Sequence, residues 1–150
     1  MKLHISRLSL FGAAFLIVCC QGCGGDQSSG STSHGDPALE GTWTGTEVDF
    51  ASGSWTLVLT ATTVDAQSSS DGESYKASYT ADTSVDPKRI LLTITDCPLA
   101  DFVGKPSNGI YKIEGTTMTL ASNIPGDTTF PTDFTPGSTH QTRVLTVTKR

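Results

Sequence analysis

The stretch Leu39-Glu40-Gly41-Thr42-Trp43 marks where the folded domain begins in this sequence of 150 residues. The residues after it alternate between apolar and polar side chains in short runs, separated by Gly, Pro, Asn and Asp, which is typical of β-strands joined by turns. The residues before it show no such pattern. A Gly two positions before a Trp often occurs by chance, so the meaning of this motif depends on the segments on either side of it.

The composition favours one all-β domain. Hydrophobic residues make up 36% and charged residues 17%, with 15 Gly and 7 Pro. The body of the chain is rich in Thr and Ser, and the β-branched Thr suits half-buried strands better than helices. A chain of this length has room for a single domain.

The first 22 residues have the three parts of a secretory signal peptide. Met1–Arg7 carries two basic residues, Leu8–Val18 is nearly all apolar, and small residues follow. The apolar part is about 11 residues long, well short of the roughly 20 that a membrane-spanning helix needs. The sequence therefore predicts an exported protein.

Cys23 follows Gly22 at the end of this segment. This resembles the lipobox of bacterial lipoproteins, in which a small residue precedes the cysteine that is lipidated and becomes the mature N-terminus. The sequence departs from that pattern at Cys20 and Gln21, where Leu and then Ala or Ser are usual. The resemblance implies lipidation at Cys23, and ordinary signal cleavage is the alternative.

Residues 23–36 form the predicted tether between the anchor and the domain. Gly24–Asp36 contains no large apolar side chain, so it cannot bury enough surface to offset the entropy lost on ordering. A flexible chain of this length reaches roughly 20 Å. We expect a lipid-anchored protein whose domain, residues 37–150, faces the periplasm or the exterior, close to a membrane.

The charge of the chain disfavours nucleic acid as a partner. The formal net charge is -5, and removal of the signal peptide with Lys2 and Arg7 leaves 8 basic against 15 acidic residues, or -7. Such a surface repels phosphate backbones and anionic lipid headgroups.

The strand pattern predicts seven strands, or eight if the segment Phe130–Phe134 adds one. The seven cover residues 42–50, 54–64, 74–81, 89–95, 109–113, 116–121 and 141–149. Short connections without a helical period indicate an antiparallel up-and-down meander. Closing it into a barrel removes both exposed edges, and a sandwich of two sheets is the alternative. Because 114 residues are few for a barrel around a wide cavity, we expect the interior to be mostly filled.

Several segments, in order, carry a resemblance to one family. They are Leu39–Trp43, Tyr79 with Asp86–Lys88, Gly109–Tyr111 with Gly115 and Leu120, Phe130–Phe134, and Val144–Arg150. Together they resemble the small lipocalin-like domain of planctomycete exported proteins, often lipoproteins, which has no established activity. Thr116 and Thr117 depart from the acid expected after the Gly.

The resemblance implies how one end of the barrel is closed. In lipocalin-like barrels the Trp of the first strand closes the floor and is covered by a cation from the end of the last strand. The floor residues would then be Gly41, Trp43 and a basic residue, with Arg150 preferred over Lys149. The alternative is that both basic residues belong to a frayed C-terminus.

The sequence shows no catalytic constellation. Cys97 is the domain's single cysteine, and its neighbours are Asp96, Pro98 and Asp101 rather than the basic groups that activate a thiol. A hydrolase using His140 and Asp133 is one interpretation, but no nucleophile motif accompanies them. Neither a calcium-loop spacing nor a phosphate-binding Gly loop is present, so the sequence predicts no metal and no cofactor.

Two non-catalytic functions remain. In the first, the barrel binds a small, largely apolar ligand in its mouth, with Glu47, Tyr75 and Tyr79 as lining residues and residues 122–140 as a lid. In the second, the interior is filled and the domain is a structural or protein-interaction module of the cell envelope. Inward-pointing polar groups at one end would favour the first.

The lipid anchor is tested by Cys23→Ser, which should move the mature protein from the membrane fraction to the soluble fraction. Fractionation followed by immunoblotting measures the change, and Cys20→Ser, which keeps the modified position, should stay with the membrane. Unchanged fractionation of Cys23→Ser would refute lipidation at this residue.

Overall fold

The computed structural model describes residues 35–49, 53–70 and 72–150. The predicted signal peptide, the lipidation site Cys23 and the tether as far as residue 34 lie outside the described residues. Every contact reported below lies within residues 35–150.

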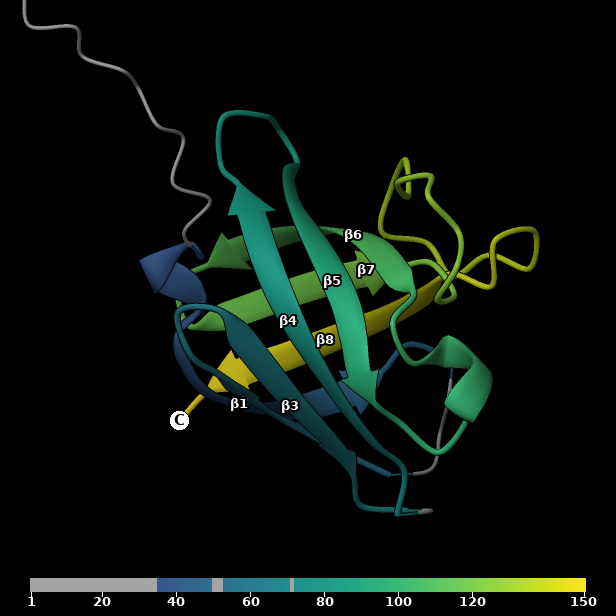
Figure 1. Cartoon of the computed structure of the whole chain (residues 1–150). Coiled ribbons are helices and arrows are strands. Elements are labelled where there is room, and N and C mark those ends of the chain that lie inside the picture. Colours follow the sequence, from purple (N-terminus) through teal and green to yellow (C-terminus); the bar gives the residue numbers. More distant parts are fainter. Residues whose placement is uncertain (1–34, 50–52, 71) are drawn as a thin grey trace, which may run out of the picture. The chain divides into compact units, whose positions relative to one another are not determined.

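The described residues form eight antiparallel strands in a closed up-and-down barrel (Figure 1). The strands are β1 (Gly41–Glu47), β2 (Trp55–Leu59), β3 (Thr63–Ser68), β4 (Ser74–Asp82), β5 (Lys88–Asp96), β6 (Pro106–Glu114), β7 (Thr117–Ser122) and β8 (Arg143–Lys149). Each strand pairs with the next, and β1 pairs with β8 to close the circle. The lipocalin-like barrel expected from the sequence is confirmed, and the two-sheet sandwich is not formed.

Two short 3-10 helices lie at opposite ends of the barrel. The helix η1 (Pro37–Leu39) precedes β1, and η2 (Ala100–Phe102) lies between β5 and β6. Figure 1 shows η1 and the C-terminus at one end, and η2 with the long β7–β8 segment at the other. We call the first end the floor and the second the mouth.

Alternation along each strand follows the sequence pattern. In β2, Trp55, Leu57 and Leu59 are buried and Val58 is exposed, as expected for a strand with one face toward a core. The same period places Tyr79 and Ala77 of β4 inside. This alternation explains why a Thr-rich sequence folds into a barrel with a continuous apolar interior.

The predicted strand over residues 54–64 is divided into β2 and β3. The chain turns between them because Thr60 makes the hydrogen bonds of the turn: its N–H donates to Thr63 O at 2.9 Å, and its Oγ1 accepts from Thr63 N at 3.1 Å. A Thr turn lacks the Gly or Pro that normally reveals one. The sequence placed no strand between residues 64 and 74, whereas β3 continues to Ser68.

The predicted extra strand at Phe130–Phe134 is wrong. This segment has no strand but lies against the outside of the barrel, where Phe130 and Phe134 pack on Ile110, Ala121 and Val144. Arg89 and Lys112 reach these rings from neighbouring strands, with their charged groups 4.6 Å and 5.6 Å from the ring centres. The eighth strand is β3, not this segment.

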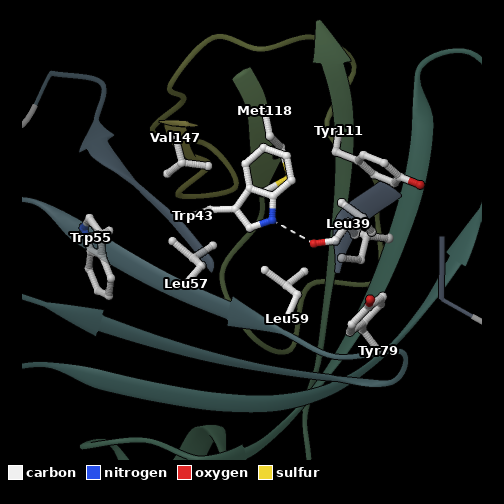
Figure 2. Close-up of a cluster of buried hydrophobic side chains, with 10 residues drawn as sticks. Leu39, Trp43, Trp55, Leu57, Leu59, Tyr79, Tyr111, Met118 and Val147 are labelled. Carbon is white, nitrogen blue, oxygen red and sulfur yellow. Dashed lines mark hydrogen bonds between the residues drawn. The ribbon is translucent and has the colours of Figure 1, made fainter. Parts of the chain in front are cut away.

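The floor is built around Trp43, whose side chain is 1% exposed. Its indole Nε1 donates to Leu39 O at 2.7 Å, so η1 is held across the end of the barrel. Figure 2 shows Trp43 surrounded by Leu39, Leu57, Leu59, Met118 and Val147, with Tyr79 and Tyr111 beside Leu39. The predicted role of Trp43 as the floor residue agrees with this packing.

The cation over Trp43 comes from Lys149, not from Arg150. Lys149 stands opposite Trp43 in the β1–β8 pairing, and its Nζ lies 5.2 Å from the indole centre. Arg150 instead donates from Nε to Thr44 Oγ1 at 3.2 Å. Residues directly opposite each other on paired strands share a face, which favours Lys149. Gly41 allows this approach: its φ is +126°, and a Cβ there would lie 2.9 Å from Lys149 Cε.

Asp36 fastens the floor to the barrel wall. Its carboxylate accepts hydrogen bonds from Lys88 Nζ at 2.8 Å, Tyr111 Oη at 2.9 Å and Ala38 N at 3.0 Å. Burial acts to raise the pKa of Asp36, but these hydrogen bonds outweigh it and hold the pKa below its ordinary value. Gly35 and Asp36 are buried, so the last two residues of the predicted tether pack against the barrel.

Trp43→Ala should lower the free energy of unfolding by about 3 to 5 kcal/mol, as expected for removal of a buried aromatic side chain. Denaturant unfolding followed by circular dichroism measures the loss. Trp43→Phe, which keeps an aromatic ring but lacks the donor to Leu39 O, should cost less. A loss below about 1 kcal/mol for Trp43→Ala would be inconsistent with a floor residue.

Asp36→Asn should destabilise the protein at neutral pH by about 1 to 3 kcal/mol, because it replaces a charged acceptor of buried hydrogen bonds. A carboxyl whose pKa is lowered on folding contributes stability above its unfolded pKa, near 3.8, and loses it as the pH falls through the folded value. The difference between wild type and Asp36→Asn should therefore be constant near pH 7 and shrink below about pH 4. A pH-independent difference would contradict this role.

Candidate functional site

A cavity of about 640 Å³ opens at the mouth of the barrel. Its wall is mostly aliphatic, and the lining side chains from the strands include Leu57, Leu59, Val64, Ala66, Ala77, Ile90, Leu92, Ile94, Met118, Leu120 and Leu145. The volume falls within the range of small-molecule sites in proteins, roughly 300 to 1,000 Å³. The expectation of a mostly filled interior is therefore wrong: the cavity is lined from Leu39 of η1 at the floor to Glu47 and Arg143 at the mouth.

An ion pair forms the polar end of the cavity. Arg143, at the start of β8, donates from Nε to Glu47 Oε1 at 2.7 Å and from Nη2 to Glu47 Oε2 at 2.6 Å. The Glu47 side chain is 4% exposed, and that of Arg143 is 44% exposed. The hydrogen bonds from Arg143 to Glu47 raise the pKa of Arg143, against the opposing effect of burial. The carboxylate is buried and the guanidinium half-exposed.

Two aromatic rings stand beside this pair. The guanidinium carbon of Arg143 lies 5.2 Å from the ring centre of Trp55, and the Trp55 and Tyr75 ring centres are 6.2 Å apart with planes tilted by 43°. Trp55 belongs to the same buried cluster as Trp43 (Figure 2). Burial, and then the charge of Glu73, raise the pKa of Tyr75, so its hydroxyl is neutral at pH 7. It donates to Glu73 Oε2 at 3.4 Å.

The β7–β8 segment, residues 123–142, forms one side of the mouth. Asn123 holds it: its Nδ2 donates to Thr129 O at 3.1 Å, and its Oδ1 accepts from Thr142 Oγ1 at 2.7 Å. Asn108 of β6 donates to Thr128 O at 2.6 Å. These bonds, with the outer packing of Phe130 and Phe134, fix the segment beside the opening. The predicted lid is thus a bound wall of the mouth.

The structure brings together two of the three predicted lining residues. Glu47 and Tyr75 both line the cavity, whereas Tyr79 lies at the floor, 3% exposed, with its hydroxyl donating to Thr60 O at 2.7 Å. Tyr79 is therefore a structural residue, and its predicted lining role is wrong. Sequence reasoning missed Arg143, although its position two residues before the inward-facing Leu145 placed it on the inner face of the last strand.

The proposed hydrolase pair is not formed. His140 Nδ1 lies 2.6 Å from Asp127 Oδ2, so its carboxylate partner is Asp127 rather than Asp133. Hydrogen bonds from Thr129, and then His140, lower the pKa of Asp127 to about 2. Among the hydrogen bonds found between described side chains, none joins His140 to a Ser, Thr or Cys. The His140–Asp127 pair fastens the β7–β8 segment, without a nucleophile.

Two other kinds of site are absent from the described residues. In the part of the chain that the structure describes, no group of three or more His, Cys, Asp or Glu side chains is arranged to hold a metal ion. Within the same residues, no helix has the length and apolar character needed to cross a membrane.

Comparison with known proteins gives no relative: no family model, curated protein or solved structure significantly matches this chain.

Proposed function

We propose that this protein is a non-catalytic binding protein for a small, largely apolar ligand held in the mouth of the barrel. The observation that supports it best is the cavity of about 640 Å³, with an aliphatic wall and one polar end formed by Glu47 and Arg143. Binding sites for small molecules combine these two properties: apolar surface for affinity and a few placed polar groups for orientation.

The place of action in this proposal is the bacterial cell envelope. The N-terminal pattern supports export and lipid attachment at Cys23, and the segment resemblance supports the lipocalin-like family of planctomycete exported lipoproteins. The protein would then hold its ligand outside the cytoplasm, close to the membrane that carries its anchor. Its partner in this proposal is an envelope protein that delivers or receives the ligand.

The alternative, a structural or protein-interaction module, depends on a filled barrel. The open cavity in the barrel and the inward-facing Glu47 count against it. The hydrolase interpretation is weaker still, because His140 is paired with Asp127 without a nucleophile.

Ala77→Phe tests the binding function by filling the cavity. Ala77 lines the cavity and is 4% exposed, so an added phenyl ring enters the binding space. We expect the chain 24–150 to bind a neutral naphthylamine dye that fluoresces in apolar surroundings, and the variant to bind it at least about tenfold more weakly, the loss expected when about 1.4 kcal/mol of contacts is removed.

Ser78→Phe is the matched control, because Ser78 is the next residue on β4 and faces outward. It adds the same ring to the same strand and should bind the dye as the wild type does. Absence of dye binding by the wild type, or equal binding by both variants, would argue against a ligand cavity. Circular dichroism of both variants shows whether each one is folded.

A further inference from the structure

The positive charge at the polar end of the cavity is balanced by neighbouring carboxylates. Among the described cavity-lining residues, Arg143 is the one basic side chain, while Glu47 and Asp49 are acidic. Arg143 directs two of its three nitrogen atoms at Glu47, and the third, Nη1, lies 3.9 Å from Glu73 Oε2. An anionic ligand would therefore meet a guanidinium whose charge is already matched by carboxylates.

The same end already accommodates a cation. The Arg143 guanidinium lies over Trp55, with Tyr75 beside that ring and Glu47 beneath the charge. Aromatic faces and carboxylates are the two groups that stabilise positive charge at a partly buried site. Since Arg143 is 44% exposed, the space in front of it is open to an incoming polar group.

The loops around the mouth add to the negative field. Those loops carry one lysine, Lys105, among the described residues, and five acidic residues: Asp49, Glu73, Asp101, Asp127 and Asp133. Two of the five are in ion pairs, Asp127 with His140 and Glu73 with Arg143. A cleft lined by an excess of one sign of charge concentrates ligands of the opposite sign.

From these observations we infer that the ligand is an amphiphile with a positively charged polar end, and that the mouth discriminates against carboxylate-ended amphiphiles of the same length. Its aliphatic part occupies the cavity between β2 and β7, and its ammonium group lies at the mouth near Asp49. This inference rests on the proposed binding function and specifies the class of ligand.

A chain-matched series tests it: decylamine, decanol and decanoate compete with the neutral dye for the chain 24–150 at pH 7 and low salt. We expect the amine to bind best, the alcohol next and the carboxylate least, with about tenfold or more between amine and carboxylate. The difference should narrow at 1 M salt, where exposed charges are screened beyond roughly 3 Å.

Glu47→Gln should reverse the preference. The substitution keeps the shape but removes the negative charge, which leaves Arg143 uncompensated, so decanoate should gain and decylamine should lose affinity. Glu114→Gln is the control, because Glu114 is 70% exposed and is the last residue of β6, at the floor end. The same change of net charge there should leave the ratio of decylamine to decanoate affinity unaltered.

Asp49→Asn supplies a second variant in case Glu47→Gln fails to fold. Asp49 has a φ of +67°, a conformation that Asn tolerates. Loss of the Asp49 charge should lower the ratio of amine to carboxylate affinity by about threefold, which is a smaller effect because this group is exposed.

The outcomes of these experiments distinguish the binding function from the charge selection. If the wild type does not bind the dye, the proposed function fails. If it binds the dye but decanoate competes as well as decylamine, the cavity stands and the charge selection is overturned. If the ratio of decylamine to decanoate affinity shifts equally in Glu47→Gln and Glu114→Gln, the effect is due to net charge, and the role of the mouth is overturned.

Discussion

The antiparallel pairing of β1 with β8 is the constraint on which the rest of the structure depends. It closes the barrel, and both ends of the molecule are set by it. At one end of the ladder, Trp43 stands opposite Lys149, whose ammonium covers the indole. At the other, Glu47 stands opposite Leu145, and Arg143, two residues earlier on the same face, reaches the carboxylate. A shift of one residue in this register would turn all of these side chains to the other face of the sheet.

The two ends use buried charge in different ways. At the floor, Asp36 joins Lys88 and Tyr111 in a closed set of hydrogen bonds that holds η1 across the barrel. At the mouth, the Glu47–Arg143 pair borders an open cavity. Buried ion pairs rarely exceed the stability of apolar residues of similar volume, because removing charges from water is costly. The Glu47–Arg143 pair is therefore the observation on which the proposed charge selection of the cavity rests.

The sequence predicted the fold from period-two alternation, and the floor from the Gly41-Thr42-Trp43 motif, because both are local signals. The errors arose where the deciding contact is distant. The Thr60–Thr63 turn carries no Gly or Pro, Phe130 and Phe134 are apolar because they cover the outside of the barrel, and Asp36 is buried only because Lys88 and Tyr111 approach it. Glu47 and Tyr75 were placed correctly at the cavity by alternation, whereas Tyr79, on the same face as Tyr75, lies too deep to reach it. The partner of Glu47 depends on a pairing 96 residues away in the chain.

The chain enters the barrel at its closed end, where Gly35 N donates to Ala61 O and Asp36 is fixed to the wall. The mouth opens at the opposite end, beyond the far ends of β1 and β8. Immobilising the protein on a sensor surface through its N-terminal segment would therefore leave the cavity facing the flowing solution, whereas a label attached to the β7–β8 segment would stand at the opening and obstruct it.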